Sequence, residues 1–71
     1  MVESYKKYVV IAAGVLEDFS RKYAPIASIS WRQDGKRGLH IIDNLPRRFW
    51  SKDEAMTFAL SEAKKWIDER V

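Results

Sequence analysis

The segment that most constrains the fold of this chain is a helix-start signal at residues 49–55, which read Phe-Trp-Ser-Lys-Asp-Glu-Ala. Ser51 is a typical N-cap residue and Glu54 stands three residues later, so the pair predicts a capping box that satisfies two backbone N–H groups. Apolar residues then recur at helical spacing as far as Ile67. We therefore predict one C-terminal helix over residues 52–69, which must lie against the elements formed by the preceding residues.

The residues before this junction carry strand patterns. Residues 7–16 are a β-branched, apolar run, and residues 23–32 alternate between apolar and polar side chains. Asp34-Gly35 is a hairpin signal that leads into a third predicted strand at residues 37–43, and residues 47–50 can add a short fourth strand. We predict an α+β fold in the order β-β-β-α, in which an antiparallel sheet of three or four strands has one C-terminal α-helix packed on one face.

Composition limits the class of protein. A chain of 71 residues is predicted to form a single domain, residues 1–71. The absence of cysteine excludes disulfides, thiolate metal ligands and a cysteine nucleophile, and it fits a reducing compartment, so we expect a cytoplasmic protein. The longest apolar run, Tyr8 to Ala13, is too short to span a bilayer and no secretory signal pattern precedes it, so we expect no membrane partner.

No pattern in the sequence predicts catalysis. His40 is the only histidine, and no cluster of histidine and carboxylate residues has metal-ligand spacing. No serine is flanked by the glycines of a nucleophile elbow. Gly35 and Gly38 lie between two predicted strands rather than before a helix, so they do not predict a phosphate loop. We predict a non-enzymatic binding module without a metal ion or a cofactor.

The distribution of charge leads to the first functional hypothesis, which is nucleic-acid binding. Residues 1–50 contain nine basic and five acidic residues, whereas the predicted helix is slightly acidic, so an anionic partner would meet the sheet and its turns. The residues predicted to face the ligand are Ser28, Ser30, Arg32 and His40, and those predicted to contact phosphates are Lys36, Arg37, Arg47 and Arg48. The same cations can also be solvated charges that protect strand edges.

The second hypothesis is a protein-interaction or homodimerisation module. The first predicted strand is apolar on both faces, but a single helix covers only one face of a sheet. The other face would expose an apolar patch, and such patches usually mark interfaces. The residues predicted to form this interface are Val9, Ile11, Ile26 and Ile42, with Phe58 as a further partner contact because it falls outside the apolar face of the helix. The two hypotheses remain open at this point.

Several residues give the chain a family resemblance. These are Tyr5 and Tyr8, Pro25 with Ser28-Ile29, and then Phe49, Ser51, Glu54-Ala55 and Trp66-Ile67-Asp68. With them the chain resembles a widespread small bacterial domain of unknown function over most of its length. The junction from Phe49 to Ala55 is also similar to that of the arm-type DNA-binding domains of tyrosine recombinases and of HicB-like antitoxins. The similarity to the recombinase arm domains implies a sheet that reads DNA, and the similarity to HicB-like antitoxins implies a module that binds a toxin and oligomerises.

Overall fold

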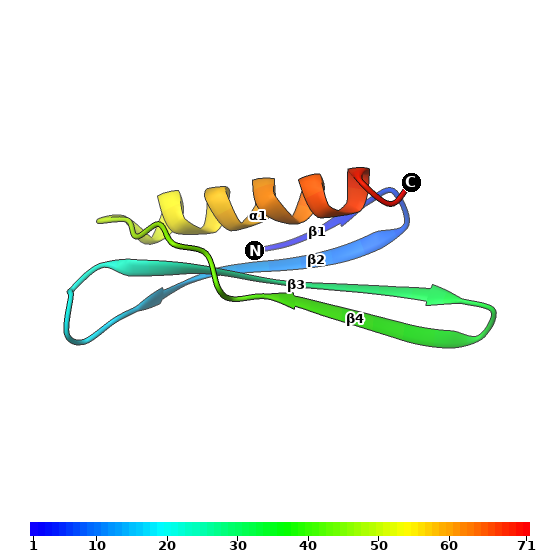
Figure 1. Ribbon diagram of the computed structural model, residues 1–71, viewed down its shortest axis with the longest axis horizontal. Coiled ribbons are helices and arrows are strands. Elements are labelled where there is room, and N and C mark those ends of the chain that lie inside the picture. The colour runs from blue at the N-terminus through cyan, green and yellow to red at the C-terminus, as the bar shows by residue number, and fades with distance from the viewer.

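The computed structural model describes all residues from Met1 to Val71. Five elements follow one another along the chain, and they are β1 (Val2–Tyr5), β2 (Tyr8–Leu16), β3 (Tyr23–Gln33), β4 (Lys36–Ile42) and α1 (Lys52–Asp68). The strands form one antiparallel sheet in the order β1-β2-β3-β4, and α1 lies along one face of it (Figure 1). This arrangement confirms the predicted α+β fold, with a four-stranded sheet.

The fourth strand is β1, and not the segment 47–50 that the sequence suggested. β1 turns back onto β2 through Lys6 and Lys7, whose φ angles are positive at 48° and 70°. Residues 47–50 contribute a single bridge, in which Phe49 and Tyr23 exchange two backbone hydrogen bonds of 2.6 and 3.0 Å. The prediction of a strand at 47–50 is therefore wrong, because this segment leads directly into α1 and has room for only one bridged residue.

The register of the sheet decides which side chains face the helix. Val10 of β2 lies opposite Ile29 of β3, and both are buried against Ala59 and Ala63 of α1. The turn at Asp34 and Gly35 joins β3 to β4 directly, so Gln33 pairs with Lys36 and Trp31 pairs with Gly38. Side chains alternate between the two faces of a strand. Gly38, His40 and Ile42 of β4 are therefore on the helix side of the sheet, whereas Leu39 and Ile41 are on the other side.

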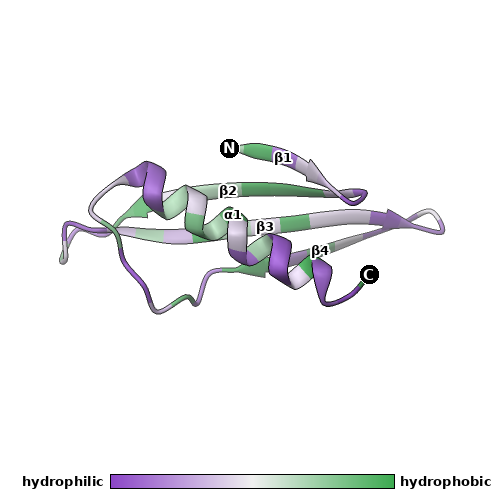
Figure 2. Cartoon of the chain, turned by 90° about the horizontal axis from the view of Figure 1, so that it is seen from above, coloured by the Kyte–Doolittle hydropathy of each residue, from purple (hydrophilic) through white to green (hydrophobic).

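Small residues let the helix lie close to the sheet. Ala55, Ala59, Ala63 and Ile67 are the buried residues of α1. A Cβ added to Gly14 would lie only 2.9 Å from both the Ala55 Cβ and the Lys52 carbonyl oxygen. Seen from above, α1 crosses the sheet obliquely, starting over β2 (Figure 2). Close approach at the start of α1 therefore depends on Gly14 and Ala55, which have almost no side chain.

An aromatic cluster fills the space between the C-terminal half of α1 and the sheet. The ring centroids of Tyr8 and Trp31 are 5.5 Å apart, and those of Trp31 and Trp66 are 5.7 Å apart. Each ring is half-buried and packs against the aliphatic core. No helix of the structure combines the length and the apolar character needed to cross a membrane.

Candidate interaction face

The face of the sheet that α1 does not cover is here called the open face, and it carries a contiguous set of aliphatic side chains. One row across the strands consists of Val2, Ile11, Ser28 and Ile41, and the next row consists of Ser4, Val9, Ser30 and Leu39. Ile11 is 49 % exposed, Ile41 52 % and Leu39 63 %. A shallow hollow also lies among Ile11, Ala13, Ile26 and Ile41. We call Val2, Val9, Ile11, Ala13, Ile26, Leu39 and Ile41 the apolar patch.

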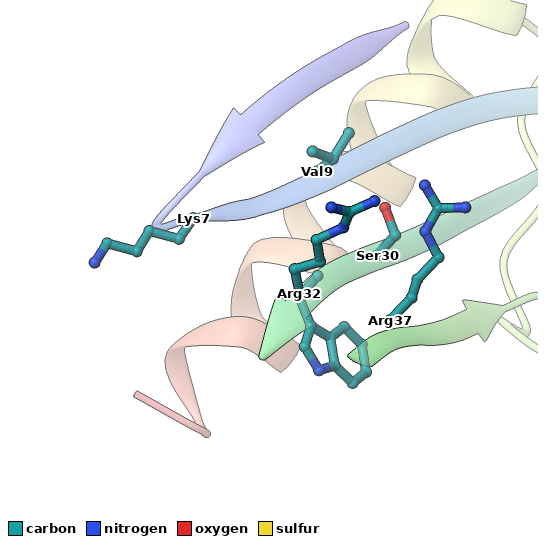
Figure 3. Close-up of a pocket in the computed structure, with 6 residues that line it drawn as sticks. Lys7, Val9, Ser30, Arg32 and Arg37 are labelled. Atoms are coloured by element: carbon teal, nitrogen blue, oxygen red, sulfur yellow. The ribbon is translucent and has the colours of Figure 1, made fainter. Parts of the chain in front are cut away.

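Basic residues gather at one end of the open face, beside the β1–β2 and β3–β4 turns. Arg32 and Arg37 lie opposite each other on β3 and β4. With Lys7, Val9, Ser30 and Trp31 they line an open pocket of about 230 Å³, which we call the basic pocket. Figure 3 shows the two guanidinium groups on either side of the Ser30 hydroxyl, whereas the Lys7 side chain points away. Neither arginine takes part in any of the ion pairs of the structure, so both are free to meet an anion.

Two residues predicted for this face are on the other one. His40 stacks on Trp66 of α1, with ring centroids 4.4 Å apart and planes inclined by 13°. Ile42 lies opposite the buried Ala27 and packs against the core. The expectation that His40 and Ile42 lie on the open face is wrong, because the direct pairing of Gln33 with Lys36 puts every even-numbered residue of β4 on the helix side. Their places on the open face are taken by Leu39 and Ile41.

Arg47 and Arg48 do not join the basic pocket. Arg48 forms a 2.9 Å ion pair with Glu17 and donates a 2.7 Å hydrogen bond to the Leu45 carbonyl oxygen. Glu17 follows β2 at the β2–β3 turn, and that turn is at the opposite end of the sheet from the β3–β4 turn (Figure 1). The guanidinium of Arg47 lies 5.0 Å from the Phe49 ring centroid. The residues predicted to contact phosphates therefore lie at opposite ends of the molecule, with Lys36 and Arg37 at one end and Arg47 and Arg48 at the other.

Lys36 and Phe58 also lie away from the open face, which the sequence did not indicate. The alternation of β4 places Lys36 on the helix side of the sheet, opposite Gln33 and beyond the aromatic cluster. Phe58 is half-buried, and its ring packs against Phe49 with centroids 5.3 Å apart. The structure thus brings together Ser28, Ser30, Arg32 and Arg37 with Val9, Ile11 and Ile26 on one surface.

A charged contact joins the end of β1 and the turn that follows it to the end of α1, away from the open face. Asp68 accepts hydrogen bonds of 2.7 Å from the Lys6 ammonium and 2.8 Å from the Tyr5 hydroxyl. The hydrogen bond from Lys6 and then that from Tyr5 lower the pKa of Asp68, and the bond to Asp68 raises the pKa of Lys6. All three side chains are accessible to solvent, so this contact ties down the edge strand rather than forming a site.

The structure has no group of three histidine, cysteine or carboxylate side chains placed to hold a metal ion. Comparison with family models, with curated proteins and with solved structures gave no match to this chain.

Proposed function

We propose that this domain is a non-enzymatic interaction module of the cytoplasm and that it associates with a second copy of itself through the open face. The observation that supports this proposal is the apolar patch, whose aliphatic side chains come from all four strands. Its exposed members, Val2, Val9, Ile11, Leu39 and Ile41, are between 39 % and 69 % exposed. Contiguous apolar surface of this kind is costly to leave in water and marks interaction sites.

The chemistry of the open face favours a protein partner over a nucleic acid. Bases bind to exposed sheets by stacking on aromatic side chains. No open-face position of the strands is aromatic, since Tyr8, Trp31 and Trp66 pack together on the helix side. Valine, isoleucine and leucine instead offer the dense aliphatic packing found between two stacked sheets. A twofold interface also needs one surface that is complementary to itself, as an aliphatic patch is.

Sedimentation equilibrium of the purified chain tests this proposal. We expect the mass of a dimer at high micromolar concentration, and a monomer for Ile11→Lys, because a charge would be buried at the centre of the interface. Phe19→Lys is the matched control: Phe19 is 89 % exposed in the β2–β3 turn, outside the apolar patch, so this variant should associate like the wild type. A wild-type monomer throughout the concentration range would reject the proposal.

Nucleic-acid binding is the second candidate function, and the basic pocket favours it. Arg32 and Arg37 present two unpaired guanidinium groups next to the Ser30 hydroxyl, a combination suited to phosphate oxygens. Titration with short single- and double-stranded DNA at low salt, followed by fluorescence anisotropy, would detect binding that falls steeply as salt is added. Under this hypothesis Arg32→Glu abolishes binding. Arg70→Glu should have little effect, because Arg70 follows the end of α1 and does not line the basic pocket.

A further inference from the structure

The charges on the open face differ from one end to the other. Along β4 the residues that alternate onto this face are Arg37, Leu39 and Ile41. Asp43, which is exposed, directly follows the last residue of the strand and is by sequence position the next member of this series. Along β3 they are Ile26, Ser28, Ser30 and Arg32. Arg32, Arg37 and Asp43 are all free of ion pairs within the chain. The apolar patch therefore has two unpaired cations at one end, and an unpaired carboxylate directly follows β4 at its other end.

One row of the sheet is a natural position for a twofold axis. Glu3, Val10, Ile29 and His40 form this row across the strands. Suppose that two copies pack face to face and that the twofold axis runs between them, parallel to this row. The rotation then places each residue of one copy over the residue of the same strand that is equally far from the row on its other side. Leu39 then lies over Ile41 of the second copy, Val9 over Ile11, and Arg37 over Asp43.

We propose that two copies pack open face to open face with their strands antiparallel, and that Arg37 of each copy pairs with Asp43 of the other. This inference rests on the proposed self-association and specifies its geometry. Two equivalent ion pairs flank an aliphatic centre, as expected of a twofold interface in which every contact occurs twice. The stem of Arg32 lies over Ile26 of the second copy, where its methylene groups cover apolar surface.

The parallel arrangement is electrostatically unfavourable. An axis along the strands would bring the end that carries Arg32 and Arg37 in one copy against the same basic end of the other copy. Opposed like charges in an interface disfavour association. The antiparallel arrangement keeps the two basic ends apart and places Asp43 of one copy opposite Arg37 of the other.

The dimensions of the molecule set an upper limit on the area of the face. The molecule measures 43 Å along its longest axis and 19 Å across it, so one copy can offer a footprint of up to roughly 800 Å². This upper limit equals what each partner contributes to a stable interface of standard size, so a dimer would use most of the face. Stacked sheets also pack with nearly aligned strands, which agrees with an antiparallel pair.

A charge-swap experiment tests the arrangement, with the dimer dissociation constant measured by sedimentation equilibrium. Arg37→Asp and Asp43→Arg should each weaken the dimer at least about tenfold, because each replaces two attractive pairs by two repulsive ones. The double variant, which carries both substitutions, should return to within about threefold of the wild type. Lys36→Asp is the matched control: it makes the same change of charge in the same hairpin but on the helix side of the sheet, and it should leave the dissociation constant unchanged.

The possible outcomes separate this inference from the proposal on which it rests. Unchanged dimers in both single variants, together with a monomeric Ile11→Lys, would keep self-association and reject the antiparallel geometry. Tighter dimers for Arg37→Asp would show the parallel arrangement. A monomeric wild type would reject both proposals. The swap also separates dimerisation from nucleic-acid binding, since Asp43→Arg adds a cation and would strengthen binding to DNA while it weakens the dimer. Circular dichroism of each variant establishes that it is folded.

Discussion

At the scale of single residues, the contact between Gly38 and Trp31 is the least tolerant of change. A Cβ added to Gly38 would overlap the indole ring, which Tyr8 and Trp66 hold from other sides. We expect Gly38→Ala to lower the free energy of unfolding by about 1–3 kcal/mol, because overpacking forces side chains and backbone to shift. Urea unfolding measures this loss. Gln33→Ala, an exposed change in the same hairpin, should stay within about 0.5 kcal/mol of the wild type. Equal stability of the two variants would contradict the packing seen around Trp31.

Asp68 provides a second prediction at this scale. The Lys6 ammonium is the largest cause of its lowered pKa, and the Tyr5 hydroxyl is the next. In an NMR titration the wild-type carboxyl should therefore titrate below its usual 3.8, and Lys6→Met should move the midpoint back up. Tyr5→Phe should move it in the same direction by less. A midpoint that does not change in Lys6→Met would mean that the contact is absent in solution.

The same contact gives the stability of the protein a pH dependence with a definite sign. Because folding lowers the pKa of Asp68, its contribution is present above the usual value of 3.8 and is lost as the pH falls through the folded value. Because folding raises the pKa of Lys6, its contribution is present below the usual value of 10.5 and is lost as the pH rises through the folded value. Wild type and Lys6→Met should therefore differ in unfolding free energy at neutral pH and converge in acid.

At the scale of elements, the start of α1 depends on one side chain. The Ser51 Oγ accepts a hydrogen bond from the Glu54 backbone N–H at 3.4 Å, but Glu54 makes no return hydrogen bond, so only half of the predicted capping box forms. We expect Ser51→Ala to cost about 0.5–1 kcal/mol in urea unfolding, the lower part of the range for N-caps, because the bond is long. Ser61→Ala, on the exposed side of the same helix, should be neutral or slightly stabilising. A loss as large in Ser61→Ala as in Ser51→Ala would argue against the cap.

The sequence predicted the longer elements and missed the short one. Apolar patterns indicate the strands β2 and β3, and Asp34-Gly35 indicates the hairpin that leads into β4. Ser51 indicates the start of α1. β1 has only four residues, and its turn is built from Lys6 and Lys7 at positive φ, where glycine or asparagine would be expected. Nothing local distinguishes it from a polar N-terminal segment. Its strand conformation comes from pairing with β2, which is a tertiary effect.

The sequence contains enough information to assign the β4 residues to the two faces of the sheet. A direct Asp34-Gly35 turn pairs residue 33 with residue 36, and it follows that Gly38, His40 and Ile42 share the face of Trp31. β4 is apolar on both faces, and this ambiguity led to the wrong placement of His40 and Ile42. The separation of Arg47 and Arg48 from Arg32 and Arg37 could not be read from sequence, because it depends on the path by which residues 43–51 return to the far end of the sheet.

At the scale of the whole molecule, the fold is one layer of sheet and one layer of helix, and the second face of the sheet is left bare. A small core results, in which Val10, Ile29 and Ile67 are among the largest fully buried side chains. Small domains bury a low fraction of their surface and are only marginally stable alone. If two copies cover each other's apolar patch, the dimer has a second core between the sheets, and folding is coupled to association.

This coupling predicts a midpoint of thermal unfolding that depends on protein concentration. Association stabilises the folded state by mass action, so the wild-type midpoint should rise by a few degrees for each tenfold increase in concentration above the dissociation constant. Ile11→Lys cannot bury its charge between the sheets, so its midpoint should be lower and the same at every concentration. Phe19→Lys should follow the wild type, because Phe19 lies outside the apolar patch. Calorimetric scans over two decades of concentration measure the effect. A wild-type midpoint that stays constant would mean that the core between α1 and the sheet stabilises the monomer alone, and that the open face does not bind a second copy.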